Sequence, residues 1–268
     1  MNTLERLQNA ELGLASEAGL TDGDYIDQRT EWIDAGFVGG IYADDETREA
    51  AMEMIARGRD EFVYDADDAP EFVRREFEKI DEDTVRGVNV RSSTLDGLLE
   101  VGRVVEEFDG VLEINAHCRQ NEMVEVGCGH ALMRDVERLE KWVRSLDTEL
   151  DVVIGLKTRA RVVGDDAQLA RGFEDAGGDV IHVDCMDSPG VIDEINDATD
   201  LVIIGNNGVR SPADVRDYLE RGADMVSTAR GGRRIESLKR IRGNVETDEK
   251  CRTQQTRTRT RTQTQTQT

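Results

Sequence analysis

The sequence predicts an α/β fold in which eight parallel strands close into a (β/α)8 TIM barrel. Apolar runs of strand length alternate with amphipathic stretches of helix length, which is the pattern of βαβ units in a parallel sheet. The alternation occurs eight times along the 268 residues. Open doubly wound sheets normally use five or six strands, so eight repeats favour a closed barrel.

Each predicted strand is a short apolar run that ends at or near a polar residue. In chain order the runs cover residues 12–16, 37–42, 87–91, 111–115, 152–157, 179–183, 201–205 and 224–228. Apolar residues recur with helical spacing between these runs, for example over 24–35, 46–57, 131–146 and 167–176. We expect these helices to form the outer layer of the barrel.

Two segments do not fit the repeat. Residues 60–83 are acidic and contain Pro70 and a predicted helix over 71–79, and we interpret them as a short helical insertion that forms a solvated flap. From residue 252 onward the chain contains only Arg, Thr and Gln. Such a tract buries too little apolar surface to offset its ordering entropy. We predict one barrel domain over residues 1–247 and a disordered low-complexity tail over 248–268.

The chain is strongly acidic, with 57 acidic against 34 basic residues and a formal net charge of −23. This balance suits a protein that stays hydrated in concentrated salt, so we infer a halophilic host. Acidity usually argues against nucleic-acid partners, because Lys and Arg bind phosphates. In molar salt, however, the Debye length is only about 3 Å, so net charge excludes little.

The sequence predicts a cytoplasmic protein. It has no run of about 18 apolar residues that could span a membrane. Its first eleven residues are polar and lack the apolar core of a signal peptide. The four cysteines, Cys118, Cys128, Cys185 and Cys251, are better treated as individual thiols than as a disulfide framework.

Polar residues gather where the predicted strands end. In a parallel barrel these ends converge on one face, where chemistry collects. The residues are Ser16, Asn89, Arg91, Asn115, Cys118, Lys157, Arg159, Asp184, Asn206, Asn207 and Arg230. Cys118 follows Asn115 just beyond the fourth strand, so its thiol is a candidate catalytic acid.

The loops after the seventh and eighth strands are rich in glycine. The seventh, residues 205–210, leads into Ser211 and Pro212, which are typical of a helix N-cap and first helical position. The eighth runs Ala-Arg-Gly-Gly over residues 229–232. Barrels often bind a phosphate between these two loops, so we predict a phosphate-bearing cofactor, with simple tight turns as the alternative.

The order of motifs resembles that of the tRNA dihydrouridine synthase family and its archaeal relatives. The fourth strand leads into Glu-Ile-Asn-Ala-His-Cys, similar to the family's Asp-Ile-Asn-x-Gly-Cys-Pro motif. The other matching segments are 15–22 (Ala-Ser-Glu-Ala-Gly-Leu-Thr-Asp), 88–90 (Val-Asn-Val), 127–135 (a Gly-x-Gly-x-x-Leu stretch), 156–159 (Lys-x-Arg), 205–208 (Gly-Asn-Asn-Gly) and 228–231 (Thr-Ala-Arg-Gly). The resemblance spans about residues 12–232.

The resemblance implies an FMN-dependent barrel that reduces the C5–C6 double bond of a uracil in tRNA, with NADPH or NADH as electron donor. It implies that Cys118 is the catalytic acid and that Asn115 and Arg159 bind substrate. No residue is implied as a metal ligand. The implied cofactor-binding residues are Ser16, Asn89, Lys157, Asp184, Asn206, Asn207, Gly208, Ala229 and Arg230.

Departures from the family pattern leave other interpretations open. Arg119 replaces the proline after the cysteine, Asp184 stands where a His is expected, and Ala229 replaces a glycine. His182 lies on the same side of its strand as Asp184 but deeper. We find no counterpart of the family's C-terminal tRNA-binding helical domain, and an alternative is therefore a dehydrogenase or reductase of a free small pyrimidine, similar to the dihydroorotate and dihydropyrimidine dehydrogenases.

Two further alternatives are a flavin-binding barrel without turnover and a metal site. The metal site would use His117, Cys118, Cys128 and His130, although their spacing fits no standard zinc finger.

Overall fold

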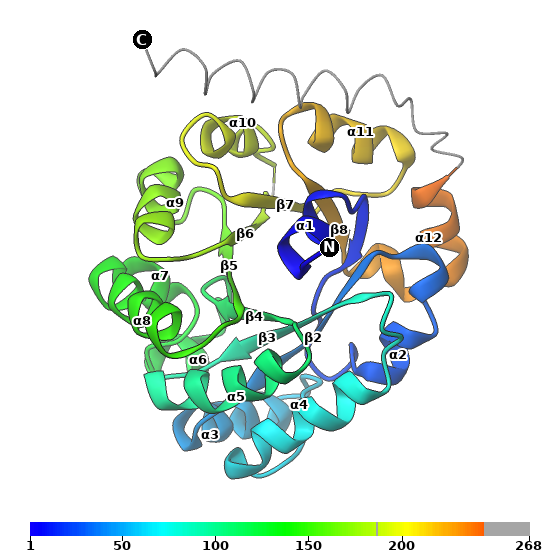
Figure 1. The fold of residues 1–268 in the computed structure, drawn as a ribbon. Coiled ribbons are helices and arrows are strands. Elements are labelled where there is room, and N and C mark those ends of the chain that lie inside the picture. The colour runs from blue at the N-terminus through cyan, green and yellow to red at the C-terminus, as the bar shows by residue number, and fades with distance from the viewer. Residues whose placement is uncertain (186, 244–268) are drawn as a thin grey trace.

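Eight parallel strands close into a barrel in sequential order, which confirms the predicted fold (Figure 1). The computed structural model describes residues 1–185 and 187–243. The strands are β1 (Leu12–Leu14), β2 (Ala35–Tyr42), β3 (Val85–Arg91), β4 (Val111–Asn115), β5 (Val153–Arg159), β6 (Val180–Asp184), β7 (Val202–Asn206) and β8 (Met225–Thr228).

Helices cover the outside of the barrel. They are α2 (Gly23–Asp27), α3 (Asp45–Ala56), α4 (Ala69–Glu78), α5 (Leu95–Glu107), α6 (Asn121–Glu125), α7 (His130–Arg134), α8 (Val136–Glu149), α9 (Asp166–Asp175), α10 (Val191–Asn196), α11 (Pro212–Glu220) and α12 (Ile235–Arg242). Single 3-10 turns occur at Thr30–Trp32, Ala66–Asp68 and Arg230–Arg233.

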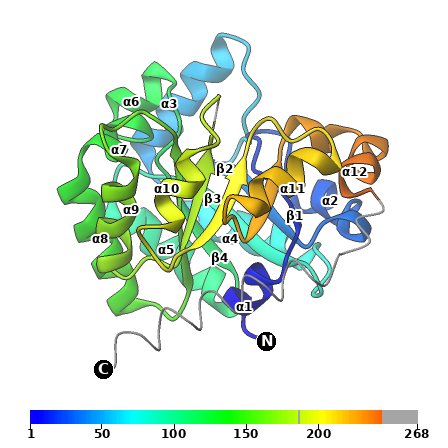
Figure 2. The same cartoon turned by 90° about the horizontal axis from the view of Figure 1, so that it is seen from above.

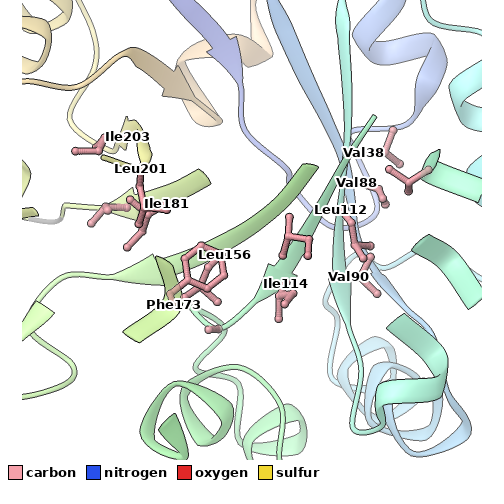
Figure 3. Close-up of a cluster of buried hydrophobic side chains, with 14 of the residues drawn as sticks. Val38, Val88, Val90, Leu112, Ile114, Leu156, Phe173, Ile181, Leu201 and Ile203 are labelled. Carbon is pink, nitrogen blue, oxygen red and sulfur yellow. The ribbon is translucent and has the colours of Figure 1, made fainter. Parts of the chain in front are cut away.

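Alternation along each strand separates two apolar layers. Outward side chains such as Val88, Leu112 and Ile114 pack against the helices in one continuous core (Figure 3). Inward side chains near the strand starts form a second cluster that includes Val111 and Met225. The first helix, α1 (Thr3–Gln8), adds Leu7 to this second cluster and lies at the end of the barrel opposite α3 and α6 (Figure 2).

Two predicted helices are shorter or divided. The pattern over 24–35 predicts one helix, but α2 ends at Asp27, a 3-10 turn follows, and β2 already begins at Ala35. The pattern over 131–146 is broken at Asp135, whose backbone is not helical (φ −94°, ψ 67°). The Asp135 side chain instead accepts a hydrogen bond from the Arg138 backbone N–H and caps α8.

The segment 60–83 contains the expected helix, but that helix is not a solvated flap. The apolar face of α4, with Phe72, Val73 and Phe77, is buried in the main core. The helix contacts β2, α2 and α5, so it is the barrel helix between β2 and β3. The additional helix is α3, which contacts α6 and β2. The acidic composition of residues 60–83 gives no sign of the apolar face of α4 that packs in the core.

The predicted tail at 248–268 lies outside the described residues. Within residues 1–185 and 187–243, no helix is both long and apolar enough to cross a membrane.

Candidate functional site

Polar side chains line the carboxyl-terminal half of the barrel interior. Six strands contribute to this polar layer: Asn89 from β3, Glu113 and Asn115 from β4, Lys157 from β5, His182 from β6, Asn206 from β7 and Ser227 from β8. Each is at most 9% exposed, so its polar atoms must find partners inside the protein. The strands therefore bring together groups that lie far apart in sequence.

Glu113 is the centre of the polar layer. Its Oε2 lies 2.5 Å from His182 Nδ1, and its Oε1 accepts a hydrogen bond from Asn89 Nδ2 at 2.7 Å. The same Oε1 lies 3.7 Å from the Lys157 ammonium nitrogen. Burial opposes charge on Glu113, but Lys157 and His182 outweigh it and lower its pKa to about 2. Glu113 is therefore an ionised carboxylate.

His182 is held in one tautomer by its neighbours. Its Nδ1 faces the Glu113 carboxylate, which can only accept, so Nδ1 carries the hydrogen. Its Nε2 lies 3.2 Å from Asn206 Nδ2, an amide donor, and 2.6 Å from Ser227 Oγ. Burial, followed by the nearby Lys157 charge, lowers the pKa of His182. The imidazole is thus neutral and accepts at Nε2.

Lys157 reaches from the polar layer toward the mouth of the barrel. Its ammonium donates to Ser16 Oγ in the loop after β1 at 3.2 Å and faces Glu113 from the other side. Burial lowers the pKa of Lys157, while Glu113 and then Asp184 oppose that shift. The site therefore holds a desolvated cation, and Glu113 is the strongest of the groups that favour its charged form.

The loop that carries Cys118 is tied to the polar layer. Asn115 Oδ1 accepts a hydrogen bond from the Cys118 backbone N–H at 3.0 Å, and Asn115 Nδ2 donates to Asn89 Oδ1 at 2.7 Å. The Cys118 carbonyl accepts from the His130 backbone N–H at 2.8 Å. Cys118 itself is partly exposed and packs against an apolar cluster that contains Tyr42 and Cys128. The chain is fixed on both sides of this thiol.

A buried ion pair borders the cysteine loop and was not predicted. Arg91 at the end of β3 lies 2.5 Å from Glu61 Oε2, and both side chains are at most 3% exposed. Arg91 also donates to the Gly40 and Ile41 carbonyls of β2. Glu61 Oε1 is buried without a hydrogen-bond partner among the described residues. The pair ties the segment that contains Glu61 to the end of β3.

Asp184, Arg159 and Asn207 form a separate group at the ends of β5, β6 and β7. The Arg159 guanidinium lies 2.8 Å from Asp184 Oδ2, and Asn207 Nδ2 donates to Asp184 Oδ1 at 2.9 Å. Asp184 thus neutralises a cation where the resemblance implied a histidine. The histidine of this strand is His182, one layer deeper.

The seventh and eighth loops use their glycines differently. Gly208 has a positive φ of 78°, and a Cβ there would meet only the Tyr218 hydroxyl at 3.8 Å. In contrast, a Cβ on Gly231 would come within 2.4 Å of Thr228 Oγ1, and one on Gly232 within 2.3 Å of Leu14 Cδ1. Packing explains Gly231 and Gly232, whereas Gly208 leaves open space beside its backbone.

The remaining implied residues lie at the edge of the site. Ala229 precedes the 3-10 turn Arg230–Arg233 and is partly exposed, and Arg230 is exposed.

His117 Nδ1 is buried and has no hydrogen-bond partner in the described part of the chain. Burial, followed by Lys157, keeps the pKa of His117 well below its ordinary value.

The four donors of the alternative metal site do not converge. In residues 1–185 and 187–243, no three of His117, Cys118, Cys128 and His130 bring their donor atoms together.

Three groups of the polar layer were absent from the predicted site. Glu113 and His182 could have been found, because each is the one polar residue before the last position of its strand, Val-Leu-Glu-Ile-Asn and Val-Ile-His-Val-Asp. Ser227 gives no such signal. Its role depends on the register that aligns it with Asn206 of β7.

The chain is similar to a known protein family and to an archaeal protein. The family model for dihydrouridine synthase (Dus) matches residues 61–267. An uncharacterized protein of Methanocaldococcus jannaschii is 29% identical over 248 residues, which cover 87% of this chain and 90% of that protein.

Solved structures show the same fold at low identity. FabK from Thermotoga maritima gives a TM-score of 0.54 at 15% identity over 85% of this chain, which spans 61% of the FabK chain. A 2,3-dimethylmalate lyase gives a TM-score of 0.55 at 12% identity, covering 85% of this chain and 81% of the lyase. At these identities the likeness concerns the fold alone.

Proposed function

Because this chain belongs to the dihydrouridine synthase family, we propose that it is an FMN-dependent oxidoreductase that reduces the C5–C6 double bond of a uracil in tRNA. The observation that carries the proposal is the fixed, partly exposed Cys118 thiol, whose loop is joined by hydrogen bonds to a layer containing a buried cation. We further propose NADPH or NADH as the electron donor and the cytoplasm as the place of action.

The residues at the mouth fit an anionic, hydrogen-bonding cofactor. Lys157 supplies a buried ammonium that can stabilise negative charge on a reduced flavin ring. The orphaned His117 Nδ1 is a buried polar atom in need of a partner. Gly208 leaves its backbone accessible for close approach of a phosphate, with Asn206, Asn207 and Ser211 nearby in sequence. We assign Ser16, Asn89 and Lys157 to the ring side, and Asp184, Asn206, Asn207, Gly208, Ala229 and Arg230 to the remainder of the cofactor.

When bound, reduced FMN supplies the hydride that adds to C6 of the uracil. Cys118 then donates a proton to C5. This role requires the thiol to lie within hydrogen-bond reach of C5 or to act through one water. Asn115 holds the Cys118 backbone in place and, with Arg159, orients the base. The protein's own contribution is therefore orientation and one positioned acid.

The proposal is tested by reconstituting the purified protein with FMN and NADPH or NADH. Incubation with unmodified tRNA should yield dihydrouridine, which mass spectrometry detects as a gain of two hydrogens in a uridine. Free uracil and orotate serve as alternative substrates in parallel assays. A protein that binds no flavin, or that reduces orotate but no tRNA uridine, would contradict the proposed function.

A further inference from the structure

We propose that Glu113 and His182 form a positioning pair that fixes the Lys157 ammonium at the mouth of the barrel and keeps it charged. The inference deepens the proposed function and rests on it, since the charge it concerns faces the cofactor site. Neither residue touches the mouth directly. Both are completely or almost completely buried, at 1% and 0% exposed, and would act through Lys157.

The two oxygens of the Glu113 carboxylate have different partners. Oε2 accepts a hydrogen bond from His182 Nδ1. Oε1 accepts a hydrogen bond from Asn89 Nδ2 and faces the Lys157 ammonium. With His182 in place, the carboxylate cannot rotate without losing a charge-assisted hydrogen bond. Oε1 is therefore directed at the ammonium, and Ser16 Oγ holds the ammonium from the opposite side.

Glu113 and His182 together carry a single negative charge. His182 is neutral, because the Asn206 amide donates toward its Nε2. The one negative charge of Glu113 thus remains available for Lys157, and the buried group is a one-to-one pair. The other titratable or charged groups that act on Lys157 or His182 are His117 in the loop after β4 and Asp184 at the end of β6. Asp184 is already paired with Arg159, which leaves Glu113 as the dominant partner.

The Glu113 carboxylate opposes the loss of the Lys157 proton. A lysine desolvated without a carboxylate loses its proton readily, and its pKa falls by one or more units. Burial already lowers the pKa of Lys157. Removing Glu113 should therefore lower the pKa of Lys157 further, so that the ammonium loses its positive charge at a lower pH than in the unsubstituted protein.

The chain suits a direct test by NMR, because it contains only three histidines and five lysines. Carbon-13 labelling of lysine in the full-length protein without flavin gives the pKa of Lys157. We expect Glu113→Gln to lower that pKa by at least one unit relative to the unsubstituted protein. The matched control is Glu76→Gln, which removes another buried carboxylate that contacts a lysine, Lys79, at 2.9 Å. This control should move the pKa of Lys79 and leave that of Lys157 unchanged.

A second measurement uses the unsubstituted protein and does not depend on the variant folding. Nitrogen-15 spectra of labelled histidine should show His182 as the neutral Nδ1–H tautomer at pH 7. A cationic His182, an Nε2–H tautomer, or an unchanged Lys157 pKa in Glu113→Gln would each overturn the positioning pair.

Flavin binding separates this inference from the proposed function. FMN affinity should fall about tenfold as Lys157 loses its proton, because a charge-assisted contact is lost. If the pair acts as inferred, this fall occurs at a pH at least one unit lower in Glu113→Gln than in the unsubstituted protein. Affinity equal to that of the Glu76→Gln control at every pH would overturn the pair. A protein that binds no FMN would overturn the proposed function, while the Lys157 and His182 titrations would still decide the pairing.

Discussion

At the scale of single residues, the molecule concentrates its chemistry in side chains that are nearly inaccessible. Glu113 is paired with Lys157 and His182 in the barrel interior. Cys118 is the proposed reactive group and is partly exposed. Motif order and strand ends predicted Asn115 and Lys157 at neighbouring strand ends, which the register of β4 and β5 confirms. The role of Cys118 stays a prediction. Motif order and strand ends could not reveal the Glu113–His182 contact, because it depends on the register across three strands, β4, β5 and β6.

Substituting Cys118 should remove turnover without removing the cofactor. We expect Cys118→Ala to lower the rate of uridine reduction by about 10²–10⁴-fold, the usual contribution of a positioned general acid. Flavin affinity should stay within about twofold of the unsubstituted protein. The matched control is Cys185→Ala, which changes a buried thiol in the apolar core outside the polar layer. Equal activity of the two variants would show that Cys118 is not the acid.

Acid should destabilise the protein through Glu113. Its folded-state pKa of about 2 lies below the unfolded value of 4.5, so its stabilisation is complete above pH 4.5 and is lost as the pH falls toward 2. The difference corresponds to about 3 kcal/mol of unfolding free energy. His182 adds to the same trend, because its lowered pKa makes the unfolded state bind more protons below about pH 6.5.

Urea unfolding at pH 7, 5, 4 and 3 checks this linkage. Glu113→Gln should be less stable than the parent at pH 7 but should lose less further stability between pH 5 and 3. Parallel curves for the two proteins over that range would mean that Glu113 does not titrate as the geometry requires.

At the scale of elements, periodicity predicted the strands better than the helices. Strands buried on both faces read as continuous apolar runs, and all eight are present. Helix limits depended on local competition that a pattern does not show. The Asp135 side chain caps α8 and divides the pattern over 131–146, and the acidic surface of α4 masks its buried face. The acidic composition predicted the exposed face of α4 correctly but not the buried apolar face that packs in the core.

The assignment of α4 as a barrel helix predicts a large cost for truncating its core side chain. Phe77 is fully buried and packs edge-on against Phe108. Phe77→Ala should lower the unfolding free energy by about 3–5 kcal/mol, because it removes apolar contacts and leaves a cavity. Glu78→Ala, on the exposed side of the same helix, should change it by no more than about 0.5 kcal/mol. Similar small effects for both substitutions would fit a solvated flap and contradict the packed helix.

At the scale of the whole molecule, charge and fold are separate properties. Two apolar layers and the polar layer in the barrel interior stabilise the fold. The acidic residues that give the formal net charge of −23 lie mainly on the surface. Surface carboxylates repel one another in the compact state more than in the expanded chain. In dilute salt, the protein is stable only if the stabilisation from its buried core exceeds this repulsion between surface carboxylates.

Salt should therefore stabilise the molecule by screening. Raising potassium chloride from 0.1 to 1 M shortens the Debye length from about 10 to about 3 Å, which removes most repulsion between separated carboxylates. We expect the thermal midpoint to rise by several degrees, as measured by circular dichroism at pH 7, where the acidic groups are ionised. Sucrose at equal osmolality is the control, because it stabilises through exclusion from the surface without screening charge. If potassium chloride stabilised no more than sucrose, the acidic surface would not limit stability, and the inference of a protein suited to concentrated salt would fail.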